Sequence, residues 1–128
     1  MIEHQGKILF SRKELSCRHC GKLELAKGFA EKLKELRLDL GVPMIVTSCC
    51  RCAAHNLAVK GKPGSYHLSS NPIAGGVCAV DIKRQGYEYD KDLMITALNK
   101  GWSVGIGKTF IHLDRRADYG APAVIFTY

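Results

Sequence analysis

The chain has 128 residues and a net charge of +7, with 46% hydrophobic and 24% charged residues. This is typical of one soluble domain, residues 1–128, large enough to bury its own core, and no apolar run reaches the roughly 18 residues of a membrane span. The start lacks the apolar stretch of a secretory signal, so we expect synthesis in the cytoplasm. The positive charge predicts attraction to polyanions, either nucleic acid or the anionic polymers of a bacterial envelope.

The first elements are a short extended or turn segment and then a helix. Residues 8–16 include Ser11 three positions before Glu14, the spacing of a helix capping box. Apolar residues then recur with a helical period over residues 23–40, with Lys, Glu and Arg on the other face, until Gly41 ends the pattern. The lysine-rich face of this helix is more typical of a solvated surface than of a binding site.

The remaining segments predict strands interrupted by two short helices and one loop. Helices are expected at residues 53–60 and 90–99, and the Gly, Ser, Asn and Pro content of 68–76 indicates a loop. Runs rich in β-branched residues predict strands at 44–47, 77–83, 102–106, 110–114 and 123–128. The fold class is therefore α+β: a mostly antiparallel sheet with a long N-terminal helix and a shorter inserted helix.

Two of the predicted strands carry side chains that can bind a metal ion. Residues two apart in a strand face the same side, so His112 and Asp114 share a face, and Asp81 points away from its apolar neighbours. Together with His67, they offer two imidazoles and a carboxylate, a sufficient set for a catalytic zinc ion with one open position. By spacing alone the prediction is weak, because an isolated histidine is usually a surface or capping residue.

Three motifs in one order resemble those of a known enzyme family. Ser65-x-His67 with Ala79-x-Asp81 is similar to the Ser-x-His-x-x-Gly-x-Ala-x-Asp signature of the zinc D-alanyl-D-alanine carboxypeptidase and endopeptidase family. The segment 110–116, Phe-Ile-His-Leu-Asp-Arg-Arg, is similar to the downstream histidine motif of phage members. Residues 45–56 resemble the family's Ile-Thr-Ser-Gly-Tyr-Arg-Cys-x-x-His-Asn block.

This resemblance implies a fold, a cofactor and an activity. The expected fold is the zinc DD-peptidase, or hedgehog-like, type. The expected cofactor is one catalytic Zn²⁺ held by His67, Asp81 and His112. The expected activity is hydrolysis of peptide bonds in peptidoglycan stem peptides or cross-links, by a monomeric, phage-encoded lysis or infection enzyme. Such an enzyme would act at the bacterial cell wall, and association with the virion is an alternative.

The chain departs from the family pattern at two places. Asp81 follows His67 by fourteen residues where the family has seven, so residues 69–75 read as a loop insertion beside the cleft. Thr109 stands where some members carry a catalytic acid. Asp114 is then the best candidate for the general base, and its alternative role is to orient a ligand or bind an arginine.

The resemblance also implies roles for three residues near the metal. Arg51 is expected to contact the substrate carboxylate or carbonyl and to stabilise the oxyanion, and the alternative is a structural salt bridge. Ser65 and Tyr66 are candidate substrate-binding residues, and the alternative is a hydrogen bond that orients a ligand.

The chain has six cysteines, which allow more than one interpretation. Cys17-x-x-Cys20 with Cys50 and Cys52, or with Cys49, can form a second, structural zinc site, although the second pair is irregularly spaced. Reduced thiols and disulfides are the alternatives. Cys78 is expected to pack in the core.

Two other functions fit parts of the sequence. A basic, zinc-finger-like module that binds nucleic acid would use the cysteines and the charge of +7. That module leaves the His-Asp-His set unexplained, so a nucleic-acid partner is not expected. An inactive homologue that keeps the metal and binds wall peptide is the other alternative.

Overall fold

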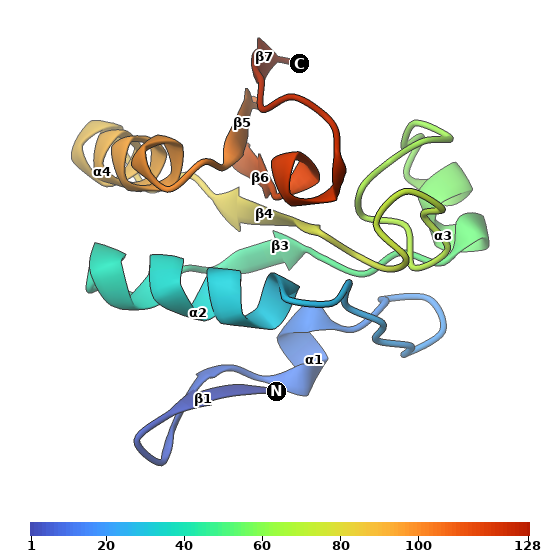
Figure 1. The fold of residues 1–128 in the computed structure, drawn as a ribbon, viewed down its shortest axis with the longest axis horizontal. Coiled ribbons are helices and arrows are strands. Elements are labelled where there is room, and N and C mark those ends of the chain that lie inside the picture. Colours follow the sequence, from blue (N-terminus) through green and yellow to red (C-terminus); the bar gives the residue numbers. More distant parts are fainter.

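The computed structural model describes residues 1–128 as two sheets and four α-helices (Figure 1). The helices are α1 (Arg12–Leu15), α2 (Phe29–Leu40), α3 (Ala53–Ala58) and α4 (Tyr87–Asn99), with a 3-10 turn at Arg116–Tyr119. The strands are β1 (Ile2–His4), β2 (Lys7–Phe10), β3 (Val46–Ser48), β4 (Ala79–Lys83), β5 (Ser103–Ile106), β6 (Phe110–Asp114) and β7 (Ile125–Thr127). The α+β prediction is confirmed. None of the helices is both long and apolar enough to cross a membrane.

The larger sheet has the strand order β3-β4-β6-β5-β7, and all of its pairs are antiparallel except β5 with β7. The smaller sheet is the hairpin β1–β2 at the N-terminus, which the sequence pattern did not predict. The mostly antiparallel sheet is therefore as predicted. The parallel β7 places the last residues of the chain beside β5, at the edge away from β3.

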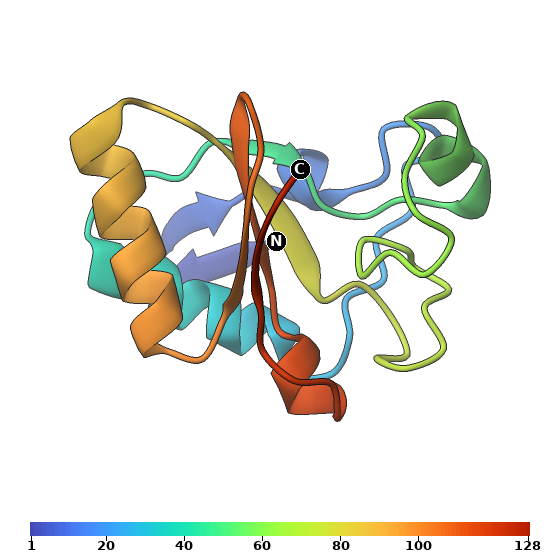
Figure 2. The ribbon, with the colours of Figure 1, turned by 90° about the horizontal axis from the view of Figure 1, so that it is seen from above.

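The two faces of the large sheet have different partners. Seen from above, α2 and α4 lie on one side of the sheet, and α3 with the long loops lies on the other (Figure 2). The core fills the helix side and joins alternate strand residues to apolar residues of both helices. These include Val80, Ile82, Ile111 and Leu113 from the strands, Leu33 and Leu36 from α2, and Leu93 and Ala97 from α4. The polar residues between them on β4 and β6 consequently face the loop side.

The predicted capping box is present at the start of α1. The Glu14 backbone N–H donates to Ser11 Oγ at 3.1 Å, and the Ser11 N–H donates to Glu14 Oε1 at 3.0 Å. The helix ends after one turn, where the buried Leu15 accepts a backbone hydrogen bond from Cys50 at 3.1 Å. This contact joins α1 to the segment that follows β3.

The long helix is shorter than its apolar pattern predicted. It begins at Phe29, after Gly28 at φ +87°, and residues 21–28 form no helix. Leu25 forms a parallel bridge with Val77. This approach requires Gly76, because a Cβ there would lie 2.8 Å from the Ala26 nitrogen. The apolar residues before Phe29 thus pack against the protein from a loop and not from a helix.

Candidate metal centre

His67, Asp81 and His112 converge on one point on the loop side of the sheet. His67 Nε2 lies 3.0 Å from Asp81 Oδ1 and 3.2 Å from His112 Nδ1, and His112 Nδ1 lies 3.0 Å from Asp81 Oδ1. All three residues are buried. The three side chains that the sequence predicted as metal ligands are therefore neighbours.

The sheet register places two of these ligands side by side. Asp81 on β4 pairs with His112 on β6, and His112 pairs with Gly105 on β5. Gly105 in turn pairs with Phe126 on β7. The four residues form one row across four strands, so they share a face. His67 comes from the loop that lies over this face, and the thirteen residues between His67 and Asp81 do not separate the two side chains.

The donor set and its spacing fit a zinc ion. Zinc bonds to nitrogen and carboxylate oxygen at about 2.0–2.2 Å, so the ligand atoms of a tetrahedral site lie about 3.3 Å apart. The three measured separations are 3.0–3.2 Å. Two imidazoles with one carboxylate is also the ligand class of catalytic zinc sites that keep an open position.

His67 is held in the tautomer that a metal ligand needs. Its Nδ1 lies 2.8 Å from the Cys49 carbonyl oxygen, which can only accept a hydrogen bond, so Nδ1 carries the proton and Nε2 keeps its lone pair. Burial lowers the pKa of His67, which favours the neutral imidazole. The Arg51 backbone N–H donates to the His67 carbonyl at 2.8 Å, which fixes the loop at this residue.

Asp114 holds His112 in one tautomer, as the Cys49 carbonyl holds His67. Its Nε2 lies 2.7 Å from Asp114 Oδ2, so Nε2 donates and Nδ1 faces the other ligands. Asp114 is fully buried and also accepts from the Arg116 backbone N–H, Nε and Nη2 at 2.7–3.2 Å. Burial would raise the pKa of Asp114, but the hydrogen bonds from His112 and Arg116 lower it to about 2.

Arg51 lies beside the ligand cluster and contacts its carboxylate. Its Nη2 is 3.3 Å from Asp81 Oδ2, its Nε is 3.1 Å from Ser48 Oγ, and its Nη1 is 3.3 Å from Asn56 Oδ1. Gly61 leaves room for the side chain of Asn56 beside Arg51, because a Cβ at position 61 would lie 2.0 Å from Asn56 Oδ1. Asn56 belongs to the segment 45–56 that resembles the family block, but no local pattern predicted a role for it.

Ser65 and Tyr66 have different surroundings. The Ser65 hydroxyl accepts a hydrogen bond from the His67 backbone N–H at 3.1 Å, so it supports the ligand that follows it. The Tyr66 ring packs against Arg116, with the guanidinium carbon 4.7 Å from the ring centroid. Arg116 thereby connects Tyr66 to Asp114.

Two aromatic residues near the centre were not predicted from the sequence. The ring centroid of His112 lies 5.5 Å from that of Phe126 and 6.3 Å from that of Tyr128. Partial burial and the charge of Asp81 raise the pKa of Tyr128 to about 12, so its phenol is protonated and can donate a hydrogen bond at neutral pH. No pattern pointed to them, because only the parallel pairing of β5 with β7 brings them here.

The cysteines form a cluster that differs from the predicted one. The structure brings together Cys17, Cys20 and Cys52, whose sulfur atoms lie within 4.8 Å of one another. Cys50 is not part of this group, and its side chain is buried among core residues. The predicted four-cysteine site is therefore wrong in one ligand.

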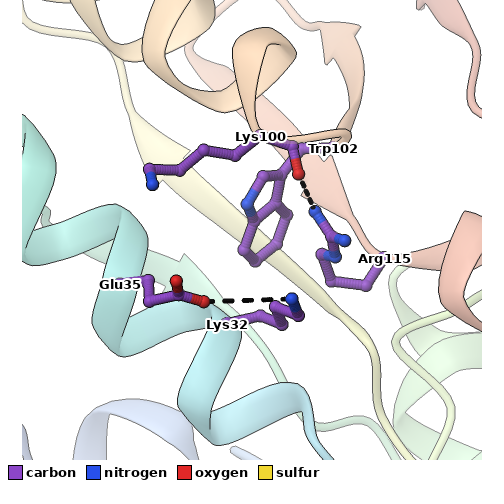
Figure 3. Close-up of a pocket in the computed structure, with 5 residues that line it drawn as sticks. All are labelled: Lys32, Glu35, Lys100, Trp102 and Arg115. Carbon is purple, nitrogen blue, oxygen red and sulfur yellow. Dashed lines mark hydrogen bonds and ion pairs between the residues drawn. The ribbon is translucent and has the colours of Figure 1, made fainter.

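A separate hollow of about 210 Å³ lies on the helix side, between α2 and the start of β5 (Figure 3). The charged side chains that line it are already paired. Arg115 donates to the Lys100 carbonyl and to Asp118, and Lys32 Nζ lies 3.9 Å from Glu35 Oε2. The indole of Trp102 forms its floor. Because these charged side chains already have partners, the ligand cluster on the opposite face, where three metal-binding side chains converge, is the better candidate for a functional site.

Comparison with known proteins agrees with this geometry. The sequence model of one family, described as Peptidase M15, matches residues 9–114. The matched region contains the three candidate ligands and Asp114. No curated protein and no solved structure gives a significant match.

Proposed function

The chain belongs to the zinc-dependent peptidase M15 family, and from this membership we propose that it hydrolyses peptide bonds in bacterial peptidoglycan. The family match covers 106 of the 128 residues, from 9 to 114. The core includes Ile2 as well as residues of the matched region, which supports one peptidase domain over residues 1–128.

One observation carries the proposal: His67, Asp81 and His112 present three ligand atoms to one point at the spacing of a zinc site. Each histidine has its other ring nitrogen bound to an acceptor, Cys49 O or Asp114 Oδ2. Such contacts are usual for histidines that bind metals. We therefore propose these three residues as the zinc ligands.

A zinc ion at this position would polarise the scissile carbonyl group and lower the pKa of a water molecule toward about 7. The side chain of Arg51 is partly exposed next to Asp81 and carries five N–H donors. We propose that it donates to the carbonyl oxygen as negative charge develops there, or to a carboxylate of the substrate. Its contacts with Ser48 and Asn56 hold the guanidinium in place beforehand.

The contacts of Asp114 favour one of its two candidate roles. Both of its oxygens are occupied by His112 and Arg116, and the side chain is fully buried. A carboxylate in this state lacks a free oxygen for the proton of a water molecule. We propose that Asp114 is a positioning residue that orients His112, and that it acts on the reaction through that ligand.

Ser65 and Tyr66 are proposed to act at the edge of the same site. The Ser65 hydroxyl already binds the His67 backbone, so we assign it to positioning. Tyr66 is partly buried and stacks on Arg116, which leaves part of its ring for contact with the substrate peptide. Tyr128 adds a phenolic donor on the other side of His112.

The proposed substrate class rests on the family and on charge. Members of the D-Ala-D-Ala carboxypeptidase type cut short peptides that end in a carboxylate, and Arg51 matches that chemistry. The net charge of +7 favours association with the anionic polymers of a bacterial wall. The motif at residues 110–116 has the form of phage members, so we infer a phage-encoded monomer that acts at the cell wall.

The experiment that tests this function measures amine release from purified peptidoglycan. Wild-type protein should release amines, and the release should stop with a chelator or in His112→Ala. His4→Ala is the matched control, because His4 lies in the separate β1–β2 hairpin and should retain full activity. Mass spectrometry of the fragments identifies the bond that is cut.

Other results would point to the alternatives. A zinc-loaded wild type that binds the wall fragments without releasing amines would favour an inactive wall-peptide-binding homologue. Release that persists in His112→Ala would overturn the metal centre itself.

A further inference from the structure

A second cluster of metal-binding side chains lies outside the proposed catalytic centre. The sulfur atoms of Cys17, Cys20 and Cys52 lie within 4.8 Å of one another, and His19 Nδ1 lies 3.4 Å from Cys52 Sγ. We propose that Cys17, Cys20, Cys52 and His19 bind a structural zinc ion. This inference does not depend on the peptidase activity.

The backbone builds this cluster from two segments that are distant in sequence. Residues 17–22 form a tight loop, in which the Cys17 carbonyl accepts from the Gly21 N–H at 2.9 Å and the Cys17 N–H donates to the Lys22 carbonyl at 2.7 Å. Gly21 has φ +74°, which a residue with a side chain rarely adopts. The loop thereby presents Cys17 and Cys20 on one side.

The other segment is the start of α3. Cys52 is the N-cap of this helix, and its sulfur accepts from the His55 N–H at 3.4 Å. The Cys52 N–H donates to Cys17 Sγ at 3.3 Å, across 35 residues of sequence. N–H groups directed at sulfur atoms stabilise the thiolate, the form that binds metal.

The spacing and the donor types fit zinc. With Zn–S near 2.3 Å and Zn–N near 2.0–2.1 Å, ligand atoms in a tetrahedral site lie about 3.6–3.8 Å apart. The three sulfur atoms lie within 4.8 Å of one another and His19 Nδ1 lies 3.4 Å from Cys52 Sγ, so reaching this geometry requires the exposed His19 side chain to move toward Cys17 and Cys20. Three thiolates and one imidazole are an established type of closed structural zinc site.

His19 and Cys20 are exposed, so a metal ion can reach the cluster and their side chains can adjust. Zinc bound to this cluster would connect the loop 17–22 to Cys52. Cys52 directly follows Arg51, and it lies three residues after Cys49, whose carbonyl oxygen accepts from His67 Nδ1. The site would therefore stabilise the segment on which two parts of the proposed catalytic centre depend. Zinc binding at this cluster would therefore raise the free energy of unfolding and would take no direct part in the reaction.

The test counts zinc ions per chain in the full-length protein, prepared with a reductant, loaded with zinc and desalted. Wild type should hold two, His112→Ala one, Cys20→Ser one, and the double variant none. Cys50→Ala is the matched control and should hold two, because Cys50 lies outside the cluster. Cobalt added to His112→Ala should give the near-ultraviolet absorption of thiolate-bound cobalt, and this band should change in His19→Ala and disappear in Cys20→Ser.

Each other result has a definite meaning. If Cys20→Ser in the otherwise wild-type chain still holds two zinc ions, the proposal is overturned, whatever happens to peptidase activity. One zinc per wild-type chain together with four titratable thiols would show a disulfide in place of the site. Loss of zinc in Cys50→Ala but not in His19→Ala would assign the fourth ligand to Cys50 and overturn the ligand set proposed here.

Discussion

His112 Nε2 lies 2.7 Å from Asp114 Oδ2, and this contact directs the other nitrogen of the ring toward His67 and Asp81. The two residues are neighbours on one strand face, and Arg116 Nη2 donates to the same Asp114 oxygen at 2.7 Å. Asp114 thus determines both the tautomer and the orientation of a proposed zinc ligand.

Replacing Asp114 by Asn should weaken zinc binding at the catalytic centre by about 10–100-fold, because the hydrogen bond to His112 loses its charged acceptor. Competition with a chromogenic chelator measures this affinity. Asp118→Asn is the matched control, since Asp118 pairs with Arg115 and forms no hydrogen bond with the proposed ligands. Unchanged zinc affinity together with a large loss of kcat would instead support proton transfer by Asp114.

Replacing Arg51 by Lys should lower kcat by about 10²–10³-fold on the wall peptide while the zinc content is retained. Lysine keeps the charge but cannot reproduce the fork that contacts Asp81, Ser48 and Asn56 together. Steady-state kinetics and zinc analysis on the same preparation give both quantities. A variant with normal kcat but reduced stability would assign Arg51 to a structural salt bridge.

Replacing Gly105 by Ala should destabilise the protein by about 1–3 kcal/mol, because the new Cβ would lie 2.5 Å from the Phe126 ring. Urea unfolding measures the change. Gly64→Ala should cost much less, since Gly64 has open space around it and no positive φ. In a Phe126→Ala background the Gly105→Ala cost should shrink, and equal costs in both backgrounds would contradict the proposed clash.

The low pKa of Asp114 predicts a loss of stability in acid for the metal-free protein. The folded pKa is about 2, below the ordinary value near 3.9, so the unfolded chain takes up this proton first. The contribution, at most about 2 kcal/mol, is complete above the ordinary value and is lost as the pH falls from about 4 to about 2. Urea unfolding with chelator at pH 5 and pH 3 should show a smaller drop in Asp114→Asn than in wild type. An equal drop would contradict this assignment.

The sequence predicted the parts of the fold that depend on local pattern. Asp81 and His112 alternate with apolar residues, so their strands and their shared face could be inferred from the period of two. The capping box at Ser11 and Glu14 was predictable for the same reason, because it depends on residues three apart. His67 lies in a loop, and only its resemblance to a family motif indicated it.

The remaining features depend on contacts between distant residues. Helical spacing from residue 23 was misleading, because Leu25 pairs with Val77 and this competes with helix formation. Phe126 reaches His112 only through the parallel pairing of β7, and Cys52 reaches Cys17 only through the path of the chain after β3. Neither contact has a signal in local periodicity or composition.

The loop between His67 and Asp81 carries its own internal support. The buried amide of Asn71 donates to the Ser65 carbonyl and accepts from the backbone N–H groups of Ile73 and Ala74, at 2.9–3.1 Å. Both ends are fixed separately, at His67 by Arg51 and at Cys78 by Tyr66. The loop is thus anchored from within as well as at its ends, so a shorter or longer segment exchanged for residues 69–75 would have to replace the Asn71 contact with Ser65 for the proposed ligand His67 to keep its position.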